Sequence, residues 1–236
     1  MLRIENKIDQ LKNEVLEMLY LVKSQLEKGQ QALLEFNEDL AHEIIAKERR
    51  VNALELRIDG DCENILALYN PVANDLRFIL AAYKINSDIE RLGDHANSVA
   101  SYILEFGEPM EKEAIEKMRL REMYATAIKM MNNVLDAFDR EDTTLARKVF
   151  KLDMVLNEIN SEASTVTAEL ARQNPDKISL YLYLFSIIRK MERVGDLTKN
   201  IAEEITFYIE AKVLKHKKDK YKSDFDNDNQ SKAENI

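Results

Sequence analysis

Acidic residues recur at helical spacing in two separate parts of this chain. Glu90 and Asp94 lie four residues apart, so an α-helix places both carboxylates on one face. Glu192 and Asp196 repeat the pair 102 residues later, inside segments that read E-R-L-G-D and E-R-V-G-D. Carboxylates held close together repel one another unless a cation lies between them. Metal binding is therefore the chemistry that these residues favour.

A second set of oxygen-bearing residues precedes each acidic pair and repeats with a spacing of 105 residues. In each half, this set has an acidic residue followed by an asparagine four positions later. Side chains that offer only oxygen ligands suit hard ions such as Mg²⁺, Mn²⁺, Ca²⁺ or iron. The candidate metal ligands are Glu48, Asn52, Glu90 and Asp94 in the first half, and Asp153, Asn157, Glu192 and Asp196 in the second.

The turns between the helices place these residues at the same height along the two helices of each hairpin. Glu48 and Asp94 lie equally far from Pro71 along the chain, and the second half has nearly the same relation around Pro175. Residues equidistant from the turn of a helical hairpin lie opposite one another, within about 3 Å of helix rise for an uncertainty of two residues. Each half is therefore predicted to bring four oxygen-bearing side chains together.

A single acidic pair beside an apolar stripe is usually only a solvated helix face. Repetition of the whole set in both halves favours a shared role instead. Gly93 and Gly195 follow the same pattern, although a glycine inside a helix costs about 1 kcal/mol relative to alanine. A close approach of two helices would explain both glycines, and so would a tolerated small residue.

The composition predicts an all-α fold. The 236 residues include only five glycines and three prolines, which are the residues that make turns and end helices. Hydrophobic residues make up 45% and charged residues 33%, a balance typical of long helices and too apolar for a mostly disordered chain.

Apolar residues spaced three and four apart predict six long helices, which form a tandem repeat of two three-helix bundles. The first helix is expected to end near Gly29. The others are expected at about 34–68, 72–105, 110–139, 141–173 and 177–212. We therefore predict a first three-helix repeat over 1–107, a second over 108–212, and a disordered tail over 213–236, where few apolar residues are spaced for burial.

Charge, cysteine content and the distribution of apolar residues limit the partners and the cellular location that we expect for this protein. The formal net charge of −9 disfavours nucleic acid as a partner. The single cysteine cannot form an intramolecular disulfide, and the charged N-terminal segment lacks the apolar core of a signal peptide, so a cytoplasmic location is expected. The most apolar stretch, 178–188, is far shorter than the roughly 20 residues of a membrane span. No membrane span is predicted.

The doubled E-R-x-G-D motif, together with N-P-V-A-N-D-L-R at 70–77, resembles the PhoU family of phosphate-signalling proteins over residues 3–212. The resemblance implies two three-helix bundles that bind multinuclear iron or zinc clusters. Mg²⁺ and Mn²⁺ are further options, which come from the oxygen-only ligand set. The resemblance places metal ligands at Glu48, Glu90, Asp94, Asp153, Glu192 and Asp196.

The resemblance also implies a function and partners. Proteins of this family are cytosolic negative regulators, commonly dimers, that link a phosphate ABC transporter to a phosphate-sensing histidine kinase. This chain departs from the pattern at Ser98, where the motif usually has asparagine, and at Asn52 and Asn157, where some members have aspartate. Fewer carboxylates would weaken metal binding.

Two other functions are compatible with long helices. A carboxylate-bridged metal enzyme would use Glu-x-x-His pairs on facing helices, and this sequence contains none, nor a phosphate-binding loop or a nucleophile with a base. We therefore predict that the chain is not an enzyme. A metal-free structural helical adaptor would share the apolar stripes but has no reason to repeat the acidic set.

Overall fold

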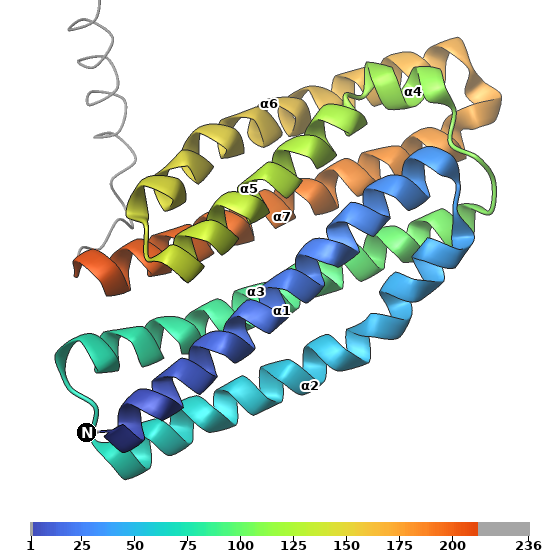
Figure 1. Cartoon of the computed structure of the whole chain (residues 1–236). Coiled ribbons are helices and arrows are strands. Elements are labelled where there is room, and N and C mark those ends of the chain that lie inside the picture. Colours follow the sequence, from blue (N-terminus) through green and yellow to red (C-terminus); the bar gives the residue numbers. More distant parts are fainter. Residues whose placement is uncertain (1, 212–236) are drawn as a thin grey trace, which may run out of the picture.

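The computed structural model describes residues 2–211, which form α-helices and one 3-10 turn with no strand among them (Figure 1). The predicted all-α fold is confirmed. The predicted disordered tail, 213–236, lies outside the described residues. The elements are α1 (Leu2–Glu35), α2 (Glu38–Tyr69), α3 (Ala73–Phe106), α4 (Lys112–Lys117), α5 (Leu120–Arg140), α6 (Thr143–Gln173), η1 (Pro175–Lys177) and α7 (Ile178–Glu210).

The ends of the long helices follow local capping chemistry. The side chain of Asn37 accepts a hydrogen bond of 3.1 Å from the backbone N–H of Leu40 at the start of α2. Asp142 caps α6 in the same way, at 2.8 Å from the N–H of Thr144. Asn70 ends α2 in the left-handed conformation, directly before Pro71. These caps fix where the hairpin turns fall.

Gly29 does not end the first helix, contrary to our prediction. Helix α1 continues through it to Glu35, so α2 begins at Glu38 rather than near residue 34. A Cβ atom at position 29 would lie 3.4 Å from the hydroxyl of Tyr124 on α5. This is an ordinary van der Waals distance, so position 29 packs against the second half of the chain and the helix continues across the glycine.

The helix predicted near 110–139 is interrupted. The short α4 ends at Lys117, and α5 begins at Leu120 after Arg119, which adopts a left-handed conformation with φ of 53°. The Arg119 guanidinium binds Glu158 of α6 at 2.6 Å. This ion pair helps to hold a turn that apolar spacing alone could not reveal.

The six long helices form two bundles that lie against each other (Figure 1). Helices α1, α2 and α3 pack together, as do α5, α6 and α7. Helix α3 contacts α7, and α1 contacts α5, so these four helices join the halves. Helices α2 and α6 lie at opposite outer edges.

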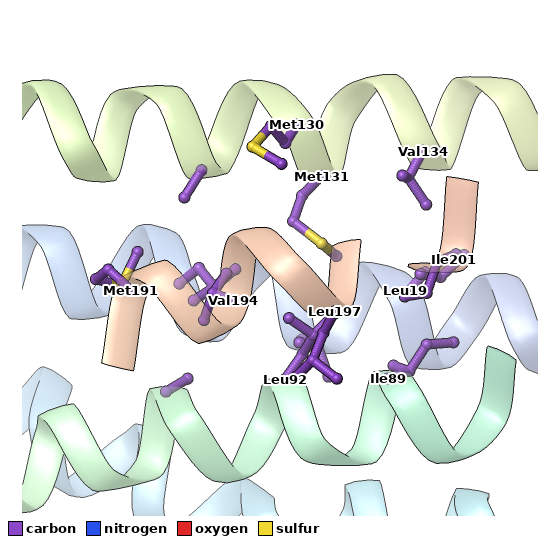
Figure 2. Close-up of a cluster of buried hydrophobic side chains, with 14 of the residues drawn as sticks. Leu19, Ile89, Leu92, Met130, Met131, Val134, Met191, Val194, Leu197 and Ile201 are labelled. Atoms are coloured by element: carbon purple, nitrogen blue, oxygen red, sulfur yellow. The ribbon is translucent and has the colours of Figure 1, made fainter. Parts of the chain in front are cut away.

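The two repeats share one hydrophobic core. Figure 2 shows side chains from α1, α3, α5 and α7 meeting between the halves, among them Leu19, Ile89, Met131 and Val194. Each of these four has no solvent-exposed area. None of the helices within 2–211 is both long enough and apolar enough to cross a membrane.

Candidate metal centre

Helices α2 and α3 bring four carboxylates into one region, which we call the first acidic cluster: Glu48, Glu55, Glu90 and Asp94. Burial raises the pKa of Glu90, and the negative charges of Asp94, Glu55 and Glu48 raise it further. Glu48 also accepts a hydrogen bond of 2.9 Å from the Nδ2 of Asn97, which links α2 to α3. The hairpin therefore holds Glu48 against α3 at Asn97, three residues beyond Asp94.

Glu55 was missed by the sequence prediction. It lies two helical turns after Glu48, and burial raises its pKa, with further contributions from Asp59 and Asp94. Asn52, the predicted ligand between them, is exposed to solvent. The seven-residue spacing of Glu48 and Glu55 was the available signal, because residues two turns apart share a helix face.

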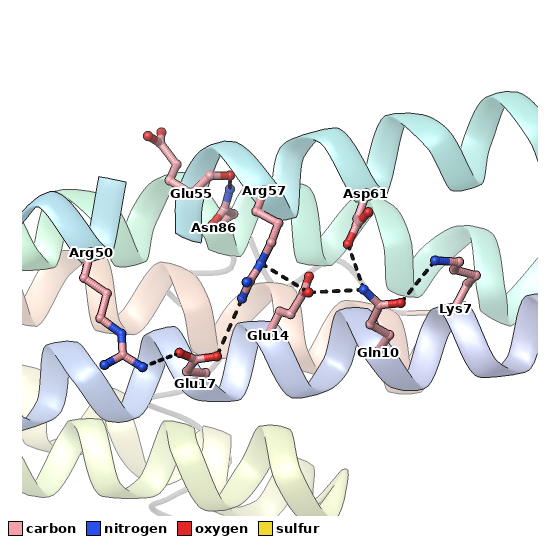
Figure 3. A network of polar contacts seen from close by, with 9 residues as sticks. All are labelled: Lys7, Gln10, Glu14, Glu17, Arg50, Glu55, Arg57, Asp61 and Asn86. Carbon is pink, nitrogen blue, oxygen red and sulfur yellow. Dashed lines mark hydrogen bonds and ion pairs between the residues drawn. The ribbon is translucent and has the colours of Figure 1, made fainter. Parts of the chain in front are cut away.

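Polar contacts fix α2 in place behind this cluster. Asn86 of α3 is fully buried, and its Nδ2 donates to the backbone oxygen of Glu55 at 2.9 Å and to Asp59 at 2.8 Å. On the side of α1, Arg57 pairs with Glu14 at 3.2 Å (Figure 3). These contacts hold Glu55 at a defined position relative to both neighbouring helices.

Helices α6 and α7 form the second acidic cluster, which consists of Asp153, Glu192 and Asp196 together with Lys199. Asp153 is only 6% exposed, an unusual degree of burial for aspartate. Burial raises the pKa of Glu192, with contributions from the charges of Asp196 and Asp153. The three predicted carboxylates of this half therefore share one region.

Lys199 and Asn157 complete the second acidic cluster. The Lys199 ammonium lies 2.7 Å from Asp153 Oδ2 and 2.9 Å from Asp196 Oδ1, so it bridges α6 and α7. Asn157 is largely exposed, but its Nδ2 donates to the same Asp153 oxygen at 3.1 Å. Lys199 was not among the predicted site residues, although its position three residues after Asp196 places it on the same helix face.

The two motif glycines permit the close approach of each helix pair. A Cβ atom at position 195 would lie 2.5 Å from a methyl carbon of Leu156 and 3.4 Å from Asp153 Oδ1. At position 93 it would lie 3.3 Å from a methyl carbon of Val51. The structure therefore supports close approach over a merely tolerated small residue, most strongly at Gly195.

Two buried oxygens in the second cluster accept no hydrogen bond, which is one test of whether a cation fits. These are Asp153 Oδ1 and Glu192 Oε2, and unsatisfied buried acceptors are costly. Glu192 Oε2 does lie 3.6 Å from the guanidinium of Arg193. Nevertheless, within residues 2–211 no three His, Cys, Asp or Glu side chains converge in an arrangement that could hold a metal ion. The donor set suits a hard cation, and the metal assignment stays a prediction.

Fold and site together define a class of protein: a tandem repeat of helical bundles in which each repeat carries an acidic cluster at its helical hairpin. The PhoU domain model matches the chain twice, over residues 15–103 and 120–205. The chain therefore belongs to the PhoU family, and the predicted resemblance is confirmed. The two matched segments correspond to the two bundles.

Relatives named for phosphate transport match most of the chain. A phosphate-specific transport system accessory protein PhoU homolog from Thermotoga maritima is 31% identical, covering 89% of this chain and 90% of its own. The Escherichia coli protein of that name is 29% identical, covering 89% and 86%. These names describe accessory proteins, not enzymes.

Solved structures share the fold. The crystal structure of PhoU from Pseudomonas aeruginosa superposes with a TM-score of 0.82 at 30% identity, covering 88% of this chain and 99% of the other. The phosphate transport system regulatory protein PhoU from Streptococcus pneumoniae gives a TM-score of 0.77 at 24% identity, covering 89% and 99%, and supports the fold alone.

Proposed function

We propose that this chain is an accessory protein of a phosphate ABC transporter and a negative regulator of phosphate uptake and of phosphate-starvation signalling. The observation that carries the proposal is the presence of both PhoU domains, in a chain whose similarity to named transport accessory proteins extends over 89% of its length. The transporter is the partner that those names indicate.

The proposal also includes a second partner and a location. The chain acts in the cytoplasm as a homodimer and links the transporter to a phosphate-sensing histidine kinase. The family resemblance supports this arrangement. Size measurement of the purified full chain by light scattering tests the dimer, and a monomer at micromolar concentration would contradict it.

Metal binding at the acidic clusters is the third part of the proposal. The ions are iron or zinc in clusters, with Mg²⁺ or Mn²⁺ as alternatives. Support comes from the duplicated carboxylates, the raised pKa values of Glu90 and Glu192, and the buried Oδ1 of Asp153, which accepts no hydrogen bond. A bound cation would supply the positive charge that lets these carboxylates ionise together, and the carboxylates would orient it between the two helices of a hairpin.

Phosphate uptake by living cells tests the regulatory role. A strain that lacks the protein should take up radiolabelled phosphate faster than its parent in phosphate-rich medium, and the wild-type chain should restore the lower rate. The combined Glu90→Gln and Asp94→Asn variant should restore it poorly, while Glu105→Gln, an exposed residue of the same helix, should restore it fully. Equal uptake with and without the protein would contradict the proposal.

A metal-free helical adaptor is the alternative that one observation favours. Lys199 already neutralises part of the second acidic cluster through its two ion pairs. Full restoration of regulation by the Glu90→Gln and Asp94→Asn variant, with no metal found by elemental analysis of protein purified without chelator, would establish this alternative.

A further inference from the structure

Helix α3 carries a second apolar stripe on its solvent-exposed side. Its buried stripe includes Ile79 and Ile89. The second stripe consists of Leu76, Leu80 and Tyr83, which share the spacing of three and four residues but stay outside the core. Leu80 is 42% exposed, Tyr83 is 45% exposed, and Leu76 is half-buried. A helix that packed only within its own bundle would carry polar side chains at these positions.

The internal repeat duplicates this exposed stripe. The shift of 102 residues that relates the two acidic motifs also maps the stripe onto α7, where its counterparts are Ile178, Leu182 and Phe185. Ile178 is 45% exposed, Leu182 is 53% exposed, and Phe185 is half-buried. A single exposed apolar residue needs no explanation, but three that recur in both halves indicate a shared role. We call the two stripes the first and second apolar patches.

Both apolar patches lie on one face of the molecule. Helix α3 packs against α1, α2 and α7, and α7 packs against α3, α5 and α6. Helices α1 and α5 cover one side of the α3 and α7 pair, and α2 and α6 flank it (Figure 1). The exposed stripes therefore point away from α1 and α5. We call this side of the molecule the α3–α7 face.

The antiparallel packing of α3 and α7 sets the patches at opposite ends of this face. The ring of Tyr102, near the end of α3, lies 6.0 Å from the ring of Tyr183, near the start of α7. Leu182 is therefore level with about residue 103 of α3, roughly 35 Å from Leu80 at 1.5 Å per residue. A half-turn about an axis between α3 and α7 exchanges the bundles and, with them, the two patches (Figure 1).

The α3–α7 face is large enough for a specific interface. Its two helices have 34 and 33 residues, so side by side they cover about 50 Å by 20 Å, or about 1,000 Å². A stable interface takes about 800 Å² from each partner. The spacing of three and four residues within each patch is typical of a seam that packs against another helix.

Charge at the centre of the face selects the kind of partner. Asp94 continues the line of the first patch about three turns after Tyr83, and Asp196 does the same for the second patch. The four and three carboxylates of the two acidic clusters outnumber the five basic side chains beside them among the described residues, Arg91, Arg189, Lys190, Arg193 and Lys199. A second copy packed face to face would therefore set like charge against like charge, whereas basic residues of a partner would be complementary.

We propose that the α3–α7 face docks a partner with twofold symmetry, which presents one apolar helix to each patch and basic residues to the acidic centre. Each repeat of the chain then contacts the same surface of one partner subunit. The inference rests on the proposed function for the identity of that partner. The two ATP-hydrolysing subunits of the phosphate ABC transporter are the symmetric pair on which we test it.

Binding of the purified full chain to the purified transporter in detergent measures the contribution of each patch. Leu80→Glu and Leu182→Glu should each weaken binding by about 100-fold, because two linked sites bind about that much more tightly than one. The double variant should lose binding altogether. Tyr20→Glu changes an exposed residue of α1, outside the face, and should bind like wild type.

Photo-crosslinking tests the symmetry and does not depend on how well the glutamate variants fold. A benzophenone-bearing residue takes the place of Tyr83 in one variant and of Phe185 in another, and mass spectrometry identifies the attached peptide. Both positions should attach to the same peptide of the ATP-hydrolysing subunit, since repeat-equivalent positions meet equivalent surfaces. Attachment to two different peptides would overturn the twofold arrangement.

The outcomes separate this inference from the proposed function. Wild-type binding that neither Leu80→Glu nor Leu182→Glu weakens would overturn the docking face and leave the transporter as partner. Weakening by only one of the two would overturn the twofold arrangement. Conversion of a wild-type dimer to a monomer by these variants, with transporter binding unchanged, would assign the face to a second copy and overturn the inference. Absence of wild-type binding to the transporter would overturn the inference together with the proposed partner.

Discussion

The close contact of α6 and α7 at Gly195 gives the sharpest stability prediction, because three glycines in helix interiors differ in the space around them. A Cβ atom at position 60 would meet nothing within 4 Å, at position 93 it would lie 3.3 Å from Val51, and at position 195 it would lie 2.5 Å from Leu156. Alanine at each position therefore gives the same chemical change at three degrees of crowding.

Two opposing terms set the size of each effect. Replacement of glycine by alanine in a helix gains about 1 kcal/mol, and overpacking of a filled core costs about 1 to 3 kcal/mol. Gly60→Ala should therefore stabilise by about 1 kcal/mol, and Gly93→Ala should be nearly neutral. Gly195→Ala should destabilise by up to about 2 kcal/mol, since Leu156 is fully buried and cannot move aside freely.

Urea unfolding of the metal-free variants, followed by circular dichroism, measures these differences. A change of 1 kcal/mol corresponds to about 2 to 4 °C in melting temperature for a chain of this size, so thermal scans provide a check. The order of stability should be Gly60→Ala, then Gly93→Ala, then Gly195→Ala. If Gly195→Ala proved as stable as Gly60→Ala, the close helix approach that places Asp153 beside Asp196 would be refuted.

Two further predictions concern pH and the shared core. The folded state raises the pKa of Glu90, so the contribution of this residue to stability is lost as pH rises through the raised value. Glu90→Gln should therefore stabilise the metal-free protein more at about pH 7.5 than at about pH 4.5. Melting curves of wild type and variant at both pH values measure the difference. A constant difference across that range would contradict the assignment. Ile89→Ala removes a fully buried side chain between the halves and should cost about 2 to 5 kcal/mol while unfolding remains a single transition. Separate transitions for the two repeats in calorimetry would show that the core is not shared.

The sequence pattern predicted the helices and turns that recur in both repeats. It missed the features that depend on how two helices pack against each other. Apolar spacing and the Asn-Pro turns predicted the C-terminal ends of three helices to within a few residues. In the structure these helices end at Phe106, Gln173 and Glu210. Glu55 was not among the predicted ligands, because it lies about 60° around α2 from Asn52 and only packing fixes which part of the helix meets α3.

Contacts of long side chains with another helix, and local interruptions of a helix, were also not predicted by the sequence pattern. Lys199 reaches across to Asp153 on α6, a contact that its own helix spacing does not specify. Arg119 interrupts a well-patterned helix through a left-handed conformation, which is rare for residues other than glycine. Gly29 is accommodated within α1 although isolated helices disfavour glycine, because contacts from neighbouring helices outweigh a propensity of about 1 kcal/mol.

The proposed repression of phosphate-starvation genes under plentiful phosphate is best tested by the activity of a starvation-induced phosphatase. In phosphate-rich medium, cells that lack the protein should express the phosphatase at starvation levels, and the wild-type chain should restore repression. Normal repression in cells without the protein would contradict the claim.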